Sequence, residues 1–105
     1  MGGRDIFVKS NNNEIQGNII SNNNWYGIFV ISSSYNNIFY NFVLKSDFGI
    51  WIENSNNNFV YNCEITDNNI GIILDRSTYN YVSKNYLTNN SRGIDLIYSS
   101  NNEIF

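Results

Sequence analysis

A repeat of 22 residues constrains the fold of this 105-residue chain more than any other feature. Three residue types recur at that spacing in four copies: glycine at Gly27, Gly49, Gly71 and Gly93, serine at Ser33, Ser55, Ser77 and Ser99, and asparagine at Asn36, Asn58, Asn80 and Asn102. Because all three keep the same phase, the repeat is structural. A repeat of this length predicts a solenoid, in which each turn of chain buries its apolar side chains by stacking on its neighbours.

An apolar alternation follows each repeat glycine. The four copies read Ile28-Phe29-Val30, Ile50-Trp51-Ile52, Ile72-Ile73-Leu74 and Ile94-Asp95-Leu96, and Ile6-Phe7-Val8 is an earlier one. The first and third positions are always aliphatic, whereas the middle position varies. Successive side chains of a strand point to opposite faces, so the constant positions are predicted to face inward and the variable one outward.

Two further sets of aliphatic residues recur at the repeat spacing; we call such a set of equivalent positions in successive repeats a file. One contains Ile15, Ile38, Val60, Val82 and Ile104, and the other contains Ile20, Val43, Ile65 and Leu87. The pattern predicts an all-β fold, a right-handed single-stranded parallel β-helix of about 4.5 coils of 22 residues with three short strands per coil. It would form a single domain over residues 1–105 that could belong to a longer β-helix. A leucine-rich repeat would need helical or Leu-x-x-Leu segments, and an ice-binding helix would need outward threonine files; neither is present.

The asparagines are expected to form ladders, since a side-chain amide can donate to one neighbouring coil and accept from the other. One ladder is predicted at Asn13, Asn36, Asn58, Asn80 and Asn102, and a second at Asn18, Asn41 and Asn85, where Cys63 occupies the missing rung. Cys63 is therefore expected to be a buried spacer rather than a nucleophile. Asparagine also tolerates left-handed backbone at corners.

The glycine file predicts a corner that needs positive φ or a close approach between coils. An extra residue between Ile20 and Gly27 predicts a bulged loop at residues 22–24.

Composition excludes several classes of protein. The net charge of −3 gives no electrostatic reason to expect a nucleic acid or an anionic membrane as partner. No apolar run approaches the length of a membrane span. Cys63 is the single cysteine, so no intrachain disulfide can form. Asparagine occurs 23 times, but it is interleaved in register with 16 isoleucines, a regularity that a disordered tract does not need.

The outward positions of the first strand suggest a surface for sugars. One outward file reads Phe7, Phe29, Trp51, Ile73 and Asp95, and the next reads Lys9, Ile31, Glu53, Asp75 and Ile97. Phe29 and Trp51 could stack on sugar rings, with Glu53, Asp75 and Asp95 as hydroxyl partners. Paired carboxylates beside an aromatic side chain also occur in glycoside hydrolases. No Lys, Arg or His converges on them, however, and no long loops exclude water, so we expect no catalytic residues.

A plainer interpretation of the same residues stays open. The carboxylates could be solvated on an exposed sheet, with Arg76 as a partner for Asp75. Outward aromatic pairs, such as Phe39 with Tyr61 and Phe59 with Tyr81, could stabilise the sheets or cover patches used in association.

The repeat unit resembles that of a known family. It reads Asn-x-Ile/Val, a second Asn with an aliphatic residue two positions on, Gly-Ile-x-Ile/Leu and Ser-x-x-Asn, from about Ile6 to Ile104. This unit resembles the parallel β-helix repeats of the NosD-like family, described as periplasmic copper-binding, within the pectate-lyase-like superfamily. The resemblance implies an extracytoplasmic or cell-surface location. It says little about activity, because such repeats also occur in polysaccharide lyases, epimerases and surface proteins.

Copper finds no support in the residues themselves. Copper sites need imidazole or soft sulfur converging from several positions. The chain has no histidine, its only methionine is the initiator, and Cys63 is a single candidate ligand. We therefore expect no metal site and no cofactor.

These features favour a non-catalytic structural or interaction module. It is expected to form homo-oligomers or filaments through uncapped ends or aromatic faces, with no nucleic acid partner and no membrane insertion. The alternative is a carbohydrate-binding module, or the truncated core of a polysaccharide-active enzyme, with a polysaccharide as partner.

Overall fold

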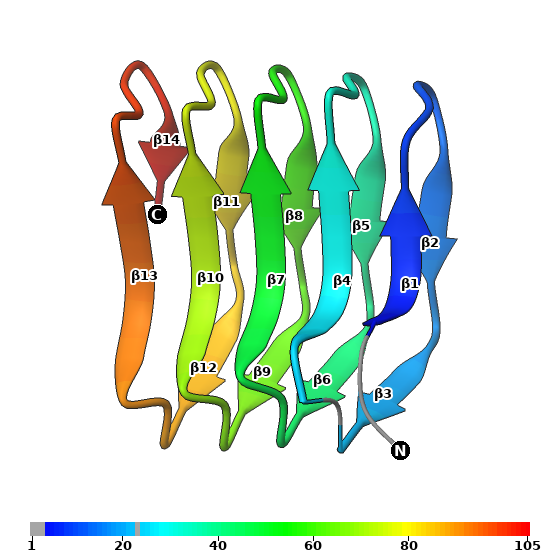
Figure 1. Cartoon of the computed structure of the whole chain (residues 1–105), viewed down its shortest axis with the longest axis vertical. Coiled ribbons are helices and arrows are strands. Elements are labelled where there is room, and N and C mark those ends of the chain that lie inside the picture. Colours follow the sequence, from blue (N-terminus) through cyan, green and yellow to red (C-terminus); the bar gives the residue numbers. More distant parts are fainter. Residues whose placement is uncertain (1–3, 23) are drawn as a thin grey trace.

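The chain winds into a β-solenoid with three short strands in each turn (Figure 1). Each strand is parallel to its counterparts in the neighbouring turns. The computed structural model describes residues 4–22 and 24–105. In Figure 1 the chain runs along a front strand, crosses to the back and returns one strand further on, in the right-handed sense. The described residues contain no helix, and hence none that could cross a membrane. The predicted right-handed parallel β-helix is confirmed.

Each of the three strands in a coil belongs to its own parallel sheet. The first sheet contains, in order, β1 (Arg4–Val8), β4 (Tyr26–Ile31), β7 (Phe48–Glu53), β10 (Ile70–Asp75) and β13 (Arg92–Ile97). The second contains β2 (Glu14–Gln16), β5 (Asn37–Phe39), β8 (Phe59–Tyr61), β11 (Tyr81–Ser83) and β14 (Glu103–Ile104). The third contains β3 (Ile19–Ser21), β6 (Phe42–Leu44), β9 (Glu64–Thr66) and β12 (Tyr86–Thr88).

The register of the strands follows the sequence repeat. Ile50 pairs with Ile28 on one side and with Ile72 on the other, and Ile72 pairs in turn with Ile94. Equivalent positions of successive repeats therefore lie directly above one another. The molecule measures 30 × 23 × 22 Å, and its longest dimension runs along the strands rather than along the stack of coils (Figure 1).

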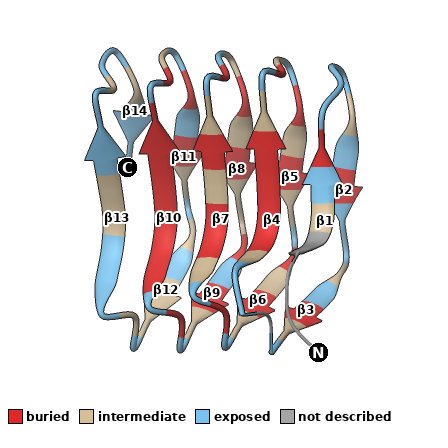
Figure 2. Cartoon of the chain, viewed as in Figure 1, coloured by how far each residue is buried: buried red, intermediate tan, exposed pale blue. Residues whose placement is uncertain are grey.

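Aliphatic side chains fill the interior of the middle coils. Ile28, Val30, Ile38, Val43, Ile50, Ile52, Val60, Ile65, Ile72 and Leu74 are fully buried. Each contributes about 2 kcal/mol through its removal from water. The core extends toward the first coil, where Val8, Ile15 and Ile20 are also buried. At the other end β13 and β14 are largely exposed, as the pale strands of Figure 2 show.

The predicted asparagine ladder is confirmed. Within it, Nδ2 of Asn36 donates to Oδ1 of Asn58 (3.0 Å), and Nδ2 of Asn58 donates to Oδ1 of Asn80 (3.1 Å). The backbone N–H of each rung donates to the same oxygen as its side chain. Because these side chains are buried, the ladder satisfies polar groups that water does not reach.

The repeat glycines do not occupy corners, and here the prediction was half wrong. Gly49 is the second residue of β7, and neither it nor Gly71 has positive φ. The predicted close approach is correct: a Cβ on Gly49 would lie 2.5 Å from the carbonyl oxygen of Gly71 and 3.1 Å from the Ile65 side chain. The glycine therefore faces the interior, where neighbouring coils leave no space for a side chain.

Left-handed backbone occurs at single-residue corners rather than at the ladder. Asn57 (φ 60°) and Tyr79 (φ 57°) each come directly before a ladder asparagine. Such corners hold several asparagines, as predicted, but also tyrosine, lysine and arginine, for example Tyr40, Lys84 and Arg76. The predicted bulge at residues 22–24 centres on Asn23, which lies outside the described residues.

Candidate functional site

The outer face of the first sheet holds the side chains expected to bind sugars. Trp51 pairs in register with Phe29 and Ile73, and Ile73 pairs with Asp95, as predicted. Around Trp51 lies an outer aromatic cluster, which we define as Tyr26, Phe29, Phe48 and Trp51. The Trp51 ring centroid is 4.7 Å from that of Phe48 and 5.3 Å from that of Tyr26.

The outer aromatic cluster is tightly packed. Phe29 is buried with 8% of its surface exposed, and its ring stacks on that of Tyr26 at 4.5 Å. Nε1 of Trp51 is buried and has no hydrogen-bond partner among the described residues. This nitrogen therefore cannot donate to a bound hydroxyl without rearrangement. These contacts stabilise the outer face of the sheet; the predicted sugar platform stays a prediction.

The three candidate carboxylates differ in their surroundings. Glu53 and Asp75 are register partners one coil apart, as predicted. The Oδ1 atom of Asp75 lies 3.0 Å from Nη1 of Arg76, so the expected partner is confirmed, but the residue is buried and the expectation that it would be solvated was wrong. Its register partners across the sheet are Glu53 and Ile97. Asp95 forms an ion pair of 3.1 Å with Arg92, so the expectation that no arginine would converge on these carboxylates was wrong.

Stacked aromatic pairs cover the outer face of the second sheet. The rings of Phe39 and Tyr61 lie 5.0 Å apart and nearly parallel, and those of Phe59 and Tyr81 lie 5.3 Å apart. Both pairs were predicted from the repeat. Parallel in-register strands bring such rings together at the spacing that offset stacking favours.

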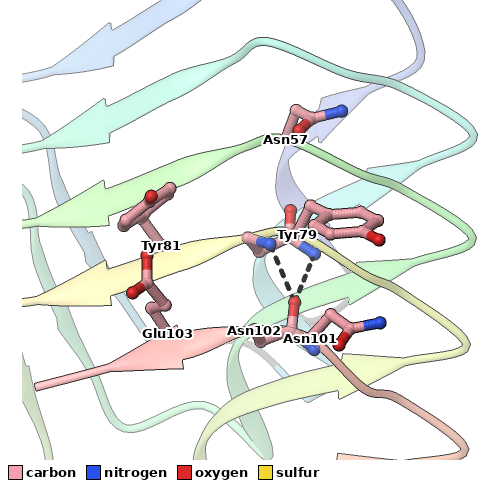
Figure 3. A pocket seen from close by; sticks show the side chains of 7 residues that line it. Asn57, Tyr79, Tyr81, Asn101, Asn102 and Glu103 are labelled. Atoms are coloured by element: carbon pink, nitrogen blue, oxygen red, sulfur yellow. Dashed lines mark hydrogen bonds between the residues drawn. The ribbon is translucent and has the colours of Figure 1, made fainter.

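A groove that the sequence did not lead us to expect runs beside the second of these pairs. It has a volume of about 470 Å³ and is lined by Asn57, Tyr79, Asn80, Tyr81, Asn101, Asn102 and Glu103. Figure 3 shows Asn57, Tyr79 and Asn101 on one side and Tyr81 with Glu103 on the other. The hydrogen bond from Tyr81 to the Glu103 carboxylate, together with the negative charge of that group, raises the pKa of Tyr81. The signal for this groove was present in the sequence, since tyrosine and asparagine alternate at residues 35, 57, 79 and 101.

The last coil presents a third surface. Leu96 is 51% exposed and Ile104 is 40% exposed, although both occupy files that are buried in earlier coils. A cavity of about 190 Å³ opens there between Val82, Leu87, Ile94, Ile104 and Phe105, beside Asn85. The apolar interior of the solenoid therefore continues to the surface at this end.

Cys63 is 1% exposed, as a buried spacer should be. Burial raises the pKa of the thiol, which stays protonated at neutral pH. Its Sγ lies 4.0 Å from Nδ2 of Asn41, and its backbone N–H donates to Oδ1 of Asn85 at 3.0 Å. Cys63 thus occupies the predicted rung of the second ladder.

Comparison with known families identifies the repeat. Residues 3–105 match the family model of NosD, described as a periplasmic copper-binding protein. The chain belongs to the NosD family. No curated protein and no solved structure matches it. The periplasmic description of NosD agrees with the extracytoplasmic location that the repeat implied, and it names no catalytic activity.

The residues of this chain do not fit a copper ion. No group of three or more His, Cys, Asp or Glu side chains converges among the described residues. The thiol of Cys63 is enclosed by the ladder and has no second sulfur or imidazole beside it, and Met1 lies outside the described residues. A soft metal needs several such donors at one point.

Proposed function

We propose that this chain is a non-catalytic structural module of an extracytoplasmic protein that associates head to tail with copies of itself. The exposed interior of the last coil carries the proposal. Leu96 and Ile104, which occupy inward files, are 51% and 40% exposed. Equivalent side chains one coil earlier, Leu74 and Val82, are buried. A further coil stacked on this end would remove the same apolar groups from water.

The polar ladders favour contact between the last coil of one copy and the first coil of another. In every internal step of the first ladder the backbone N–H of an asparagine donates to Oδ1 of the next coil, as Asn58 does to Asn80, and the second ladder repeats this pattern except where Cys63 replaces the acceptor. At the last coil the backbone N–H groups of Asn85 and Asn102 have no acceptor among the described residues. At the first coil Oδ1 of Asn13 and Oδ1 of Asn18 have no donor within the same part of the chain.

Stacking the last coil of one copy on the first coil of another would join these donors to these acceptors. Both ladders would then continue across the junction in the pattern seen inside the solenoid. A contact between unlike surfaces does not close on itself, so repeated addition would give a filament.

Two of the three candidate carboxylates support a non-catalytic role. Asp75 and Asp95 each form an ion pair with an arginine, at 3.0 and 3.1 Å. A catalytic acid and base would need two carboxyl groups that both reach the substrate.

Light scattering coupled to size-exclusion chromatography tests the proposal. We expect the mass of the wild-type chain to increase with concentration and to pass that of a dimer. Leu96→Arg should remain monomeric, because it places a charge in the middle of the contact. Tyr40→Arg, which changes an exposed corner in a middle coil, should behave as the wild type does. A strict monomer at high concentration would reject association.

A carbohydrate-binding module, or the truncated core of a polysaccharide-active enzyme, is the second candidate. It is favoured by the partly exposed Trp51 beside Glu53, whose carboxylate has no ion-pair partner among the described residues. A Trp25→Phe variant keeps Trp51 as the only tryptophan, and its fluorescence should change when an oligosaccharide binds. No change across neutral and acidic oligosaccharides would contradict this candidate.

A further inference from the structure

One file of corner residues alternates tyrosine and asparagine along the solenoid. Its members Tyr35, Asn57, Tyr79 and Asn101 all have left-handed backbone, with φ between 57° and 60°. Backbone hydrogen bonds connect neighbouring coils here: Tyr35 N–H donates to Asn57 O at 2.9 Å and Tyr79 N–H to Asn101 O at 3.1 Å, while Asn57 N–H donates to the carbonyl oxygen of Thr78, the residue before Tyr79, at 3.3 Å. Left-handed backbone suits asparagine but is unfavourable for a bulky residue such as tyrosine. The two tyrosines therefore stand where local backbone preference would not place them.

Both tyrosine rings are open to solvent. Tyr35 and Tyr79 are each 57% exposed, and neither ring contacts another aromatic ring among the described residues. The side-chain amides of Asn57 and Asn101 make no hydrogen bond within the same residues, in contrast to the ladder amides beside them. The file thus presents two aromatic faces and two free amides in alternation.

The groove lies along the Asn57–Tyr79–Asn101 part of this file, and Tyr35 continues the file one coil beyond the groove (Figure 3). Its far wall is Tyr81, whose ring is held by stacking on Phe59 at 5.3 Å. Glu103 lies on the same wall as Tyr81, and its carboxylate can accept hydrogen bonds. The wall therefore offers a fixed aromatic ring and a carboxylate acceptor opposite Tyr79.

The spacing of the coils suits an extended polysaccharide. Neighbouring coils lie about 4.8 Å apart, so Tyr35 and Tyr79, two coils apart, are separated by about 10 Å along the axis. One pyranose ring of an extended, equatorially linked chain covers close to one coil spacing. Alternate rings of such a chain can therefore stack on Tyr35 and Tyr79, while hydroxyl groups of the ring between them reach Asn57 and those of the ring beyond Tyr79 reach Asn101.

We propose that the groove beside the Tyr35–Asn57–Tyr79–Asn101 file binds a neutral, extended polysaccharide that lies parallel to the solenoid axis. Amides that both donate and accept match hydroxyl groups, which do the same. The lining residues include no cation, and Glu103 together with the net charge of −3 disfavours an acidic polymer. The site does not use Trp51 and does not depend on self-association.

Titration with cellohexaose, followed by calorimetry or by amide chemical shifts, tests this proposal. Cellohexaose is neutral and extended; maltohexaose has the same composition but a curved chain. The variant is Tyr79→Asn, because asparagine already occupies the neighbouring corners and should preserve the fold. Tyr40→Asn is its matched control: Tyr40 also has left-handed backbone and is 63% exposed, but it lies at another corner.

We expect cellohexaose to bind and maltohexaose to bind at least tenfold more weakly. Tyr79→Asn and Tyr35→Asn should each weaken cellohexaose binding by about tenfold, as the removal of an aromatic anchor commonly does, and Tyr40→Asn should leave it unchanged. Thermal unfolding of each variant confirms that the fold is retained. No binding of cellohexaose at millimolar concentration would overturn the proposal. So would equal effects of Tyr79→Asn and Tyr40→Asn, or equal affinity for the two hexasaccharides.

Discussion

The side-chain amide of Asn58 donates a hydrogen bond of 3.1 Å to Oδ1 of Asn80, one coil further along the chain. The backbone N–H of Asn58 donates to the same oxygen at 2.9 Å, and both side chains are fully buried. Asn58 in turn accepts from Asn36 and donates to the carbonyl oxygen of Ser33. A single asparagine thus connects three successive coils.

Removal of this rung should destabilise the fold strongly. Asn58→Ala leaves the buried N–H of Asn36 and the carbonyl of Ser33 without partners, and we expect the free energy of unfolding to fall by about 3 kcal/mol. Asn69→Ala is the control, because Asn69 is exposed and its side chain forms no hydrogen bond with the described residues. Urea unfolding of both variants measures the difference. Equal stability would show that the ladder contributes nothing.

The repeat glycines allow a matched comparison. A Cβ on Gly49 would lie 2.5 Å from the carbonyl oxygen of Gly71, whereas a Cβ on Gly93 would meet nothing closer than 3.8 Å. Gly49→Ala must push two backbones apart and should cost about 2 kcal/mol or more. Gly93→Ala should be neutral or stabilising by up to about 1 kcal/mol, because alanine restricts the unfolded chain. Thermal unfolding decides, and a larger loss at Gly93 than at Gly49 would contradict the packing described here.

Cys63 interrupts the second ladder, and an asparagine should restore it. The Sγ atom is a weak acceptor 4.0 Å from Nδ2 of Asn41, and an amide oxygen there would accept a stronger bond. We expect Cys63→Asn to be more stable than Cys63→Val by about 1 kcal/mol. Chemical unfolding of the two variants provides the measurement. Greater stability of the valine variant would show that position 63 acts only as an apolar spacer.

The pKa of Tyr81 should depend on Glu103. The hydrogen bond from the phenol to the Glu103 carboxylate favours the neutral form and raises the pKa above its ordinary value of 10.0. Its stabilising effect is therefore present below pH 10 and is lost as the pH rises through the raised pKa. An NMR titration of labelled tyrosine in the wild type and in Glu103→Gln measures this shift, which should shrink in the variant. An unchanged pKa in Glu103→Gln would exclude the contact.

Most of the fold could be predicted because each strand, corner and ladder position of a solenoid occurs once in every coil. Positions such as Ile50 and Asn58 have counterparts in several repeats. Inward positions could therefore be recognised because their residue type is constant, and outward positions because it varies. The prediction that the repeat glycines occupy corners was wrong. Position 49 needs a glycine because the carbonyl oxygen of Gly71, in the neighbouring coil, leaves no space for a side chain. The spacing of residues in the sequence does not show how closely the backbones of neighbouring coils approach at this position.

The surfaces were harder to predict than the core. The sequence places Asp75 on an outward file with Arg76 as a partner, but only the structure shows that this carboxylate is buried. The groove was missed because Tyr79 lies at a corner, outside the strand files that carry the repeat. Its relation to Tyr81 and Glu103 depends on how the corner turns, which the repeat does not specify.

Head-to-tail association is tested most directly by covalent capture of the proposed junction. In a Cys63→Asn chain, cysteines would replace Asn13 and Asn102, the first and last rungs of the ladder. Stacked coils place such residues about 4.8 Å apart, within the range that a disulfide spans. After mild oxidation we predict a series of disulfide-linked multimers longer than a dimer from the double-cysteine chain, and only monomer from the chain with Asn102→Cys alone. Monomer from the double-cysteine chain, or dimer from Asn102→Cys alone, would contradict the proposed association.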